Sequence, residues 1–145
     1  MNSLKIKEIV KRLVKIHGTN DPFRIANYLD YIIVYCDLEP PTKGFYQYVK
    51  RNNIIYIDNG LNEFEQKMVC GHELAHAFLH KDTNAVFLDT RTFLNKSKFE
   101  IQANLFNAEL LIRENLSEYE GWTCEQIACE LCLSPYLIQL KYNNL

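Results

Sequence analysis

The sequence lacks any long hydrophobic run, and no stretch of about 18 apolar residues offers a membrane-spanning helix. Its first residues also lack the apolar core and small-residue cleavage site of a secretory signal, so we expect a cytoplasmic protein. Neither sign of charge dominates, because 16 Lys and Arg stand against 18 Asp and Glu. This balance shows no basic footprint for nucleic acid or for an anionic membrane surface.

The cysteines do not form the even set that a disulfide framework needs. Five cysteines in a sequence of cytosolic type favour reduced thiols. Cys124, Cys129 and Cys132 do have the C-x4-C-x2-C spacing that opens plant-type ferredoxin cluster sites. No fourth cysteine follows Cys132, and the segment has an amphipathic helical pattern. We therefore expect these thiols to fill space in the core rather than to hold an iron–sulfur cluster.

The composition is that of one globular domain, with 145 residues, 48% of them hydrophobic and 12% aromatic. Apolar residues recur at helical spacing over 6–14, which predicts a helix that ends near Gly18. Asp21 followed by Pro22 is typical of the start of a second, short helix. β-branched and aromatic runs predict strands, the last two joined by a tight turn at 50–53. The strands are expected at residues 31–36, 45–49 and 54–58, with a further short one at 85–88.

The most informative stretch contains His72, Glu73 and His76 in the string His-Glu-x-x-His. A capping box at 62–65 predicts that the stretch is helical. Residues four apart lie on one face of a helix, so both histidines can direct a ring nitrogen at one metal ion. Glu73 lies about 100° around the helix, where a general base acting on water should stand. The alternative is that both are ordinary surface or core histidines.

His80 continues the histidine stripe, four residues after His76. One helix cannot easily bring three histidines that span two turns onto one tetrahedral zinc ion. We therefore expect His80 to support the site or to pack beside it, not to bind the metal. In the predicted hairpin, Tyr46 is a candidate for a hydroxyl that lines the cleft.

A zinc ion held by two histidines needs a third protein ligand, and a glutamate on a second helix is one established solution. Glu100 is such a candidate, in a predicted helix over 97–112. The alternatives are Glu109, Glu114 and Asp89, and Ser97-x-x-Glu100 can equally be a helix-starting capping box. Asn104, one turn after Glu100, can hydrogen-bond the second nitrogen of a metal histidine.

Taken together, these residues resemble the ImmA/IrrE family of zinc metallopeptidases over most of residues 5–115. The likeness is carried by Asp21-Pro22, Gly44-Phe45-Tyr46, the strand at 53–58, Gln66, the segment 72–80 and the segment 100–111. Asn107 and Ile112-Arg113 depart from the alanine and proline that family members often have there. These departures affect packing and the helix end rather than the proposed ligands.

The resemblance implies an α+β fold with a mostly helical, zincin-like core over 1–115 and a small sheet of about three strands. It implies one Zn2+ held in gluzincin fashion by His72, His76 and Glu100, with Glu73 activating water and Asn104 orienting His72. It also implies a protein substrate. Several relatives resemble proteases of phages and integrative elements that cleave a helix-turn-helix repressor, and others act in stress responses.

Residues 116–145 are expected to form a C-terminal helical hairpin that looks like a helix-turn-helix. Its second helix has one positive charge and several bulky apolar side chains over 135–141, whereas phosphate contacts need several Lys or Arg. Direct nucleic-acid binding is therefore not expected, and we favour packing on the core or contact with the substrate. Two alternatives remain: a DNA-binding regulator, and a repressor-binding protein with a structural zinc and no proteolysis.

Overall fold

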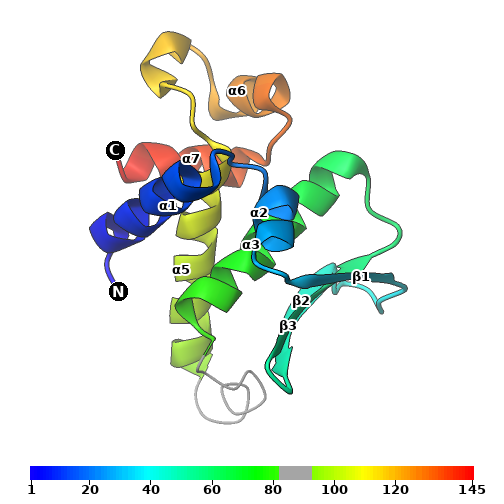
Figure 1. Ribbon diagram of the computed structural model, residues 1–145. Coiled ribbons are helices and arrows are strands. Elements are labelled where there is room, and N and C mark those ends of the chain that lie inside the picture. Colours follow the sequence, from blue (N-terminus) through cyan, green and yellow to red (C-terminus); the bar gives the residue numbers. More distant parts are fainter. Residues whose placement is uncertain (82–92) are drawn as a thin grey trace.

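Helices make up most of the structure, and a small sheet lies to one side of them (Figure 1). The computed structural model describes residues 1–81 and 93–145. In chain order the elements are α1 (Ser3–His17), α2 (Pro22–Tyr28), β1 (Ile32–Cys36), β2 (Gly44–Val49), β3 (Asn52–Asp58), α3 (Glu63–Leu79), α5 (Phe93–Leu111), the 3-10 helix η1 (Leu116–Tyr119), α6 (Cys124–Leu131) and α7 (Pro135–Asn143). The predicted α+β class is confirmed, whereas the strand expected at 85–88 lies outside the described residues. None of the described helices is both long and apolar enough to cross a membrane.

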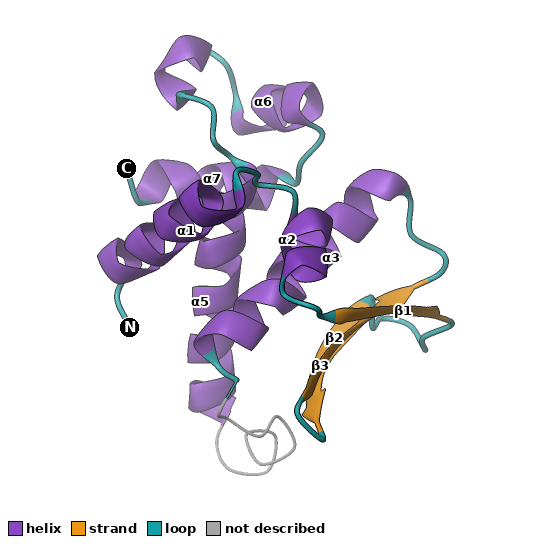
Figure 2. Cartoon of the chain, in the orientation of Figure 1, coloured by secondary structure: helices purple, strands orange, loops and turns teal. Residues whose placement is uncertain are grey.

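The sheet has the strand order β1-β3-β2, with β3 parallel to β1 and antiparallel to β2. Ile55 and Ile57 of β3 are fully buried, because the central strand is covered by α3. Figure 2 shows the sheet beside α3, with α2 lying over α3 and leading into β1. The sheet therefore forms a wall along one side of the histidine helix.

The hairpin turn differs from its prediction. Asn52 and Asn53 do not form the turn but begin β3, paired with Val49 and Tyr48. The turn consists of Lys50 and Arg51, whose φ angles are 49° and 65°. Positive φ at both central residues is the two-residue geometry whose twist matches that of the flanking strands. Strand twist therefore places two long basic residues in a conformation that asparagine would adopt more readily.

Helix α3 begins as predicted. The Asn62 side chain accepts a hydrogen bond from the Glu65 amide at 2.9 Å, and the Glu65 side chain accepts one from the Asn62 amide at 3.3 Å. Leu74 and Ala75 are fully buried, whereas Phe64 in the first turn is 52% exposed. Burial of the central turns holds the His-Glu-x-x-His segment in a rigid element.

Helix α5 is longer than expected, and it packs against α1, α3 and α7. Because it begins at Phe93, residues 97 and 100 lie inside the helix, and the predicted capping box at Ser97 is wrong. The predicted apolar stripe is confirmed at Ala103, Phe106 and Leu110, which are fully buried. Each large side chain buried in this way contributes about 1.5–3 kcal/mol.

Helix α7 packs on α5, and α6 packs on α7. Leu137 and Ile138 of α7 belong to the same buried cluster as residues of α1, α3 and α5. The Lys141 Nζ atom lies 2.6 Å from the Glu109 Oε2 atom, and both side chains are largely buried. Helix α7 is therefore tied to the core by apolar contacts and by an ion pair. The division into units 1–115 and 116–145 stays a prediction.

Candidate metal centre

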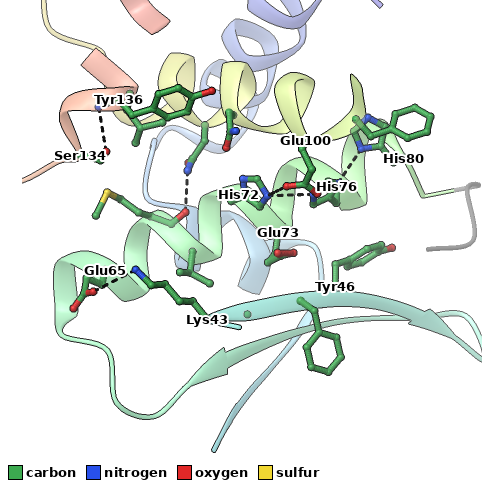
Figure 3. Close-up of a pocket in the computed structure, with 18 of the residues that line it drawn as sticks. Lys43, Tyr46, Glu65, His72, Glu73, His76, His80, Glu100, Ser134 and Tyr136 are labelled. Atoms are coloured by element: carbon green, nitrogen blue, oxygen red, sulfur yellow. Dashed lines mark hydrogen bonds and ion pairs between the residues drawn. The ribbon is translucent and has the colours of Figure 1, made fainter. Parts of the chain in front are cut away.

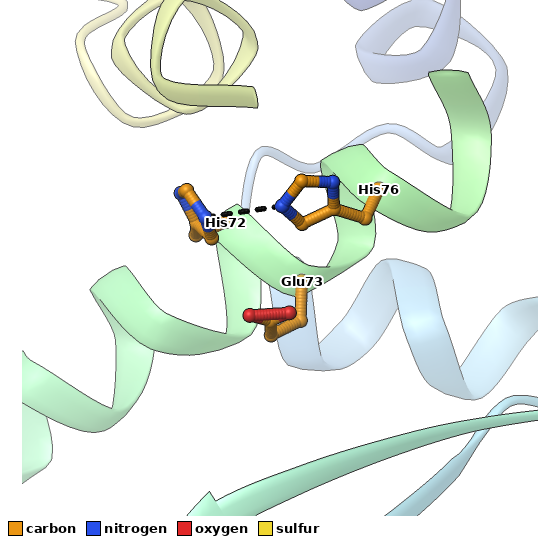
Figure 4. Close-up of side chains that lie close together, drawn as sticks. All are labelled: His72, Glu73 and His76. Atoms are coloured by element: carbon orange, nitrogen blue, oxygen red, sulfur yellow. Dashed lines mark hydrogen bonds between the residues drawn. The ribbon is translucent and has the colours of Figure 1, made fainter. Parts of the chain in front are cut away.

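Helix α3 presents the two histidines on one face and Glu73 beside them (Figure 4). The Nε2 atoms of His72 and His76 are 3.2 Å apart. One oxygen of Glu73 and one nitrogen of each ring lie within 4.8 Å of one another. The helical spacing of four residues, predicted from the sequence, accounts for this juxtaposition.

Glu100 reaches the same point from α5. Its Oε2 atom lies 3.0 Å from His72 Nε2, and its Oε1 atom lies 2.9 Å from His76 Nε2. The structure thus brings together the three predicted ligands, although Glu100 follows His72 by 28 residues and lies on another helix. Of the alternatives, Glu109 pairs with Lys141 instead, and Asp89 lies outside the described residues.

The donor set and its spacing fit a zinc ion. Tetrahedral zinc with bonds of about 2.0–2.2 Å has ligand atoms about 3.3–3.5 Å apart. The two histidine nitrogens lie 3.2 Å apart, and each lies 2.9–3.0 Å from one of the two oxygens of the Glu100 carboxylate. Two imidazoles and one carboxylate are also a known ligand set of catalytic zinc, which keeps one position open.

The charges at the site differ between its two carboxylates. Hydrogen bonds from His72 and His76 hold the pKa of the Glu100 carboxyl far below its usual range. Burial instead raises the pKa of the Glu73 carboxyl, although both histidines oppose this. Burial alone would lower the pKa of His72, but its hydrogen bond to Glu100 and the nearby Glu73 carboxylate outweigh burial and raise it. Glu100 therefore remains ionised, whereas Glu73 accepts a proton more readily than an exposed glutamate.

His80 does not join the cluster but lies behind His76. The Nδ1 atoms of these two rings are 2.9 Å apart, and His80 Nε2 lies 2.8 Å from Gln102 Oε1. The Gln102 amide nitrogen in turn donates to the Met1 carbonyl at 3.2 Å, so its oxygen faces His80. Burial lowers the pKa of His80 and favours the neutral ring. In neutral His80, Nε2–H donates to Gln102, so Nδ1 accepts a hydrogen bond from His76 Nδ1–H. With a metal ion bound, this tautomer of His76 would offer its Nε2 lone pair to the ion.

Gln102 was not predicted from the sequence. It lies two residues after Glu100 and is 6% exposed. The one available signal was a polar residue next to the buried stripe of α5. Its contact with His80 links α5 to the end of α3. The spacing of residues along the sequence cannot predict a contact between two helices.

Asn104 and Tyr46 also lie at the site. The Asn104 side chain hydrogen-bonds His72, and both Asn104 and Tyr46 line the cleft beside the histidines. The Tyr46 hydroxyl donates to the side-chain oxygen of Asn53 on the neighbouring strand. Both residues therefore lie beside the histidines, and their roles stay a prediction.

The three ligands line a cleft of about 700 Å3 between β2, α3, α5 and α7 (Figure 3). The sequence analysis did not predict which residues of α7 line the cleft, because this depends on how α7 packs on α5. Apolar side chains line much of the cleft on the N-terminal side of His72. They are Met68 and Val69 of α3 and Tyr136 and Leu137 of α7.

Comparisons with known proteins agree with the geometry. The profile of the Peptidase_M78 family, described as the IrrE N-terminal-like domain, matches residues 26–120. The chain belongs to the ImmA/IrrE metallopeptidase family. It is 39% identical over 139 residues to "Uncharacterized immunity region protein 2" of Bacillus phage phi105. This alignment covers 94% of this chain and 88% of the relative. It is 31% identical over 145 residues to "Metallopeptidase ImmA" of Bacillus subtilis (strain 168). This alignment covers 97% of this chain and 85% of the relative.

Among solved structures, the chain is similar to a Mycobacterium tuberculosis transcriptional regulator. The TM-score is 0.64 at 10% sequence identity, and the match covers 94% of this chain. The chain spans 46% of that protein's length. At this identity the likeness shows a shared fold alone.

Proposed function

We propose that this protein is a cytosolic zinc endopeptidase in which His72, His76 and Glu100 hold the ion and Glu73 is the catalytic base. The observation that carries the proposal is the meeting of two imidazole nitrogens and one carboxylate, from two helices, at 2.9–3.2 Å. When bound there, zinc would lower the pKa of water to about 7 and polarise the scissile carbonyl. His80 and Asn104 would hold the two imidazoles in the required tautomer and orientation.

Glu73 is suited to move a proton. One oxygen of its carboxylate lies within 4.8 Å of a nitrogen of each histidine ring, and burial raises its pKa above that of an exposed glutamate. A base whose pKa is close to the ambient pH both accepts a proton and returns it efficiently. Glu73 would take the proton of the attacking water and later deliver it to the leaving amine.

The cleft is suited to an extended peptide. Within the described residues β2 pairs with β3 on one side only, and Gly44 and Tyr46 of β2 line the cleft. A peptide segment can add to a free strand edge through its backbone groups. The apolar part of the cleft would then receive a side chain of the substrate next to the scissile bond.

We further propose that the substrate is a helix-turn-helix repressor of a phage or integrative element. The names of the two relatives, a phage immunity region protein and a metallopeptidase, support this choice. Direct DNA reading by α7 is poorly supported. Leu137 and Ile138 are buried in the core and cannot face DNA. Lys141 is paired with Glu109, so its ammonium group is not available for a phosphate contact.

The test is coincubation of the zinc-loaded protein with the purified repressor encoded beside its gene. We expect two repressor fragments by electrophoresis and mass spectrometry, and none when a chelator is added or when His76→Ala replaces the wild type. Coelution of intact repressor with the protein would instead favour the alternative of a structural zinc and binding without cleavage. A shift of operator DNA by the protein alone would favour the DNA-binding alternative.

A further inference from the structure

Helices α3 and α5 meet closely at Gly71 and Asn107. Asn107 is 3% exposed, and its side-chain nitrogen donates to the Met68 carbonyl of α3 at 2.8 Å. Its Oδ1 atom is buried and has no hydrogen-bond partner within the described part of the chain. A Cβ atom built on Gly71 would lie 2.0 Å from that oxygen, 3.1 Å from the Asn107 Cγ atom and 3.6 Å from its nitrogen. The Asn107 amide thus occupies the space of the side chain that Gly71 lacks.

This contact lies next to the candidate metal centre. Gly71 directly precedes His72, and Asn107 follows Glu100 by two helical turns on the same face of α5, about 10.5 Å along its axis. A change of spacing at this contact therefore moves the glutamate relative to the histidines.

We propose that Gly71 and Asn107 are a matched pair that sets the spacing of α3 and α5 and so positions Glu100 against His72 and His76. The proposal rests on the proposed function, because it assigns the pair a role in metal binding. Neither residue contacts the reacting atoms, so both are positioning residues.

The size of the effect follows from the distances. An ordinary contact needs about 3.4 Å, so a methyl group on Gly71 would have to move by about 1.4 Å from an oxygen now 2.0 Å away. Metal–ligand distances tolerate about 0.2 Å, so even a fraction of this displacement would disturb the triplet. The amide cannot yield by rotation without losing its hydrogen bond to the Met68 carbonyl.

The sign of the effect is informative as well. Alanine in a helix interior is ordinarily more stabilising than glycine. Gly71→Ala should therefore raise stability if the space is free and lower it if Asn107 fills the space. Asn107→Ala removes the obstacle, so the double variant should recover stability and metal binding together.

The experiment compares four variants of the full chain: Gly71→Ala, Asn107→Ala, the double variant, and Gly71→Ala combined with Ile101→Ala. The last is a matched control, because Ile101 also lies on α5 but is 50% exposed. Zinc affinity is measured by competition with a chromophoric chelator, metal geometry by the visible spectrum of the Co2+-loaded protein, and stability by thermal unfolding of the metal-free protein.

We expect Gly71→Ala to weaken zinc binding at least tenfold, to change the Co2+ spectrum and to lower the melting temperature by several degrees. The double variant should return to within threefold of wild-type affinity with the wild-type spectrum, and the Ile101 control should not. Asn107→Ala alone should lose less than Gly71→Ala, because it removes a contact without forcing the helices apart.

Wild-type zinc affinity and Co2+ spectrum in Gly71→Ala would overturn the positioning role, as would equal rescue by the Ile101 control. A merely structural defect would lower the melting temperature but leave the Co2+ spectrum unchanged, which also counts against the proposal. If the wild type bound no metal, the proposed function would fail. The melting temperatures of the metal-free variants would still decide whether Gly71 and Asn107 are a matched pair.

Discussion

Replacement of Glu73 by glutamine separates catalysis from metal binding. Glutamine has the shape of glutamate but cannot accept the proton of water, and the three proposed ligands are untouched. Loss of a general base typically costs about 10²–10⁴-fold in rate, which corresponds to about 3–5 kcal/mol of transition-state stabilisation. We therefore expect Glu73→Gln to bind one zinc ion per chain and to cleave at most about a hundredth as fast as the wild type.

The same substitution changes stability in a direction that the structure determines. Burial raises the pKa of Glu73, so at neutral pH its ionised form is held in the native state at a cost that glutamine does not have. The metal-free variant should be at least as stable as metal-free wild type at pH 7. This advantage should shrink as the pH falls toward about 4, where the carboxyl is protonated in both the native and the unfolded states.

The assay combines repressor cleavage, zinc content by mass spectrometry and thermal unfolding at several pH values. Glu63→Gln is a matched control, because Glu63 lies on the same helix but is exposed, and it should behave as wild type in all three. Cleavage by zinc-loaded Glu73→Gln at the wild-type rate would refute the assignment of the base. Loss of zinc in this variant would show that Glu73 binds the metal rather than water.

Three further predictions concern the core, the thiols and the metal. Glu109→Ala leaves the largely buried Lys141 ammonium unpaired and should lower the free energy of unfolding by about 3 kcal/mol. Glu109→Gln combined with Lys141→Met should lower it much less. Urea unfolding measures the free energy of unfolding of both variants. Because burial raises the pKa of the Cys70 thiol, iodoacetamide should label exposed Cys129 and Cys132 first and Cys70 only on unfolding; equal labelling of all three would contradict this. EDTA should lower the melting temperature, because a metal at a thousandfold excess over its Kd stabilises the native state by about 4 kcal/mol; an unchanged melting temperature would count against a bound metal.

Local interactions made several elements predictable. The capping box of Asn62 and Glu65 and the spacing of His72 and His76 involve residues within one or two helical turns, so their chemistry alone determines their geometry. The same holds for the start of α2 at Asp21 and Pro22. The sequence alone therefore yielded the fold class and the placement of His72, Glu73 and His76 together on one helix.

The predictions that were wrong concern where elements begin and end. The hairpin turn uses Lys50 and Arg51 because strand twist and pairing decide which residues enter the ladder. Helix α5 begins at Phe93 rather than at Ser97. Ser97 with Glu100 has the form of a capping box, but that local pattern did not determine where the helix starts.

Tertiary structure alone decided which residues join the histidines. On its sequence pattern Glu109 was one of three alternatives to Glu100, but packing turns it toward Lys141 of α7. Gln102 reaches His80, and Tyr136 reaches the cleft, only because helices far apart in the chain pack together. Residue spacing predicts contacts within a helix or a hairpin. The crossing of α3 and α5 instead depends on how their side chains fill the space between them. The Asn107 amide, which fills the space beside Gly71, is an example.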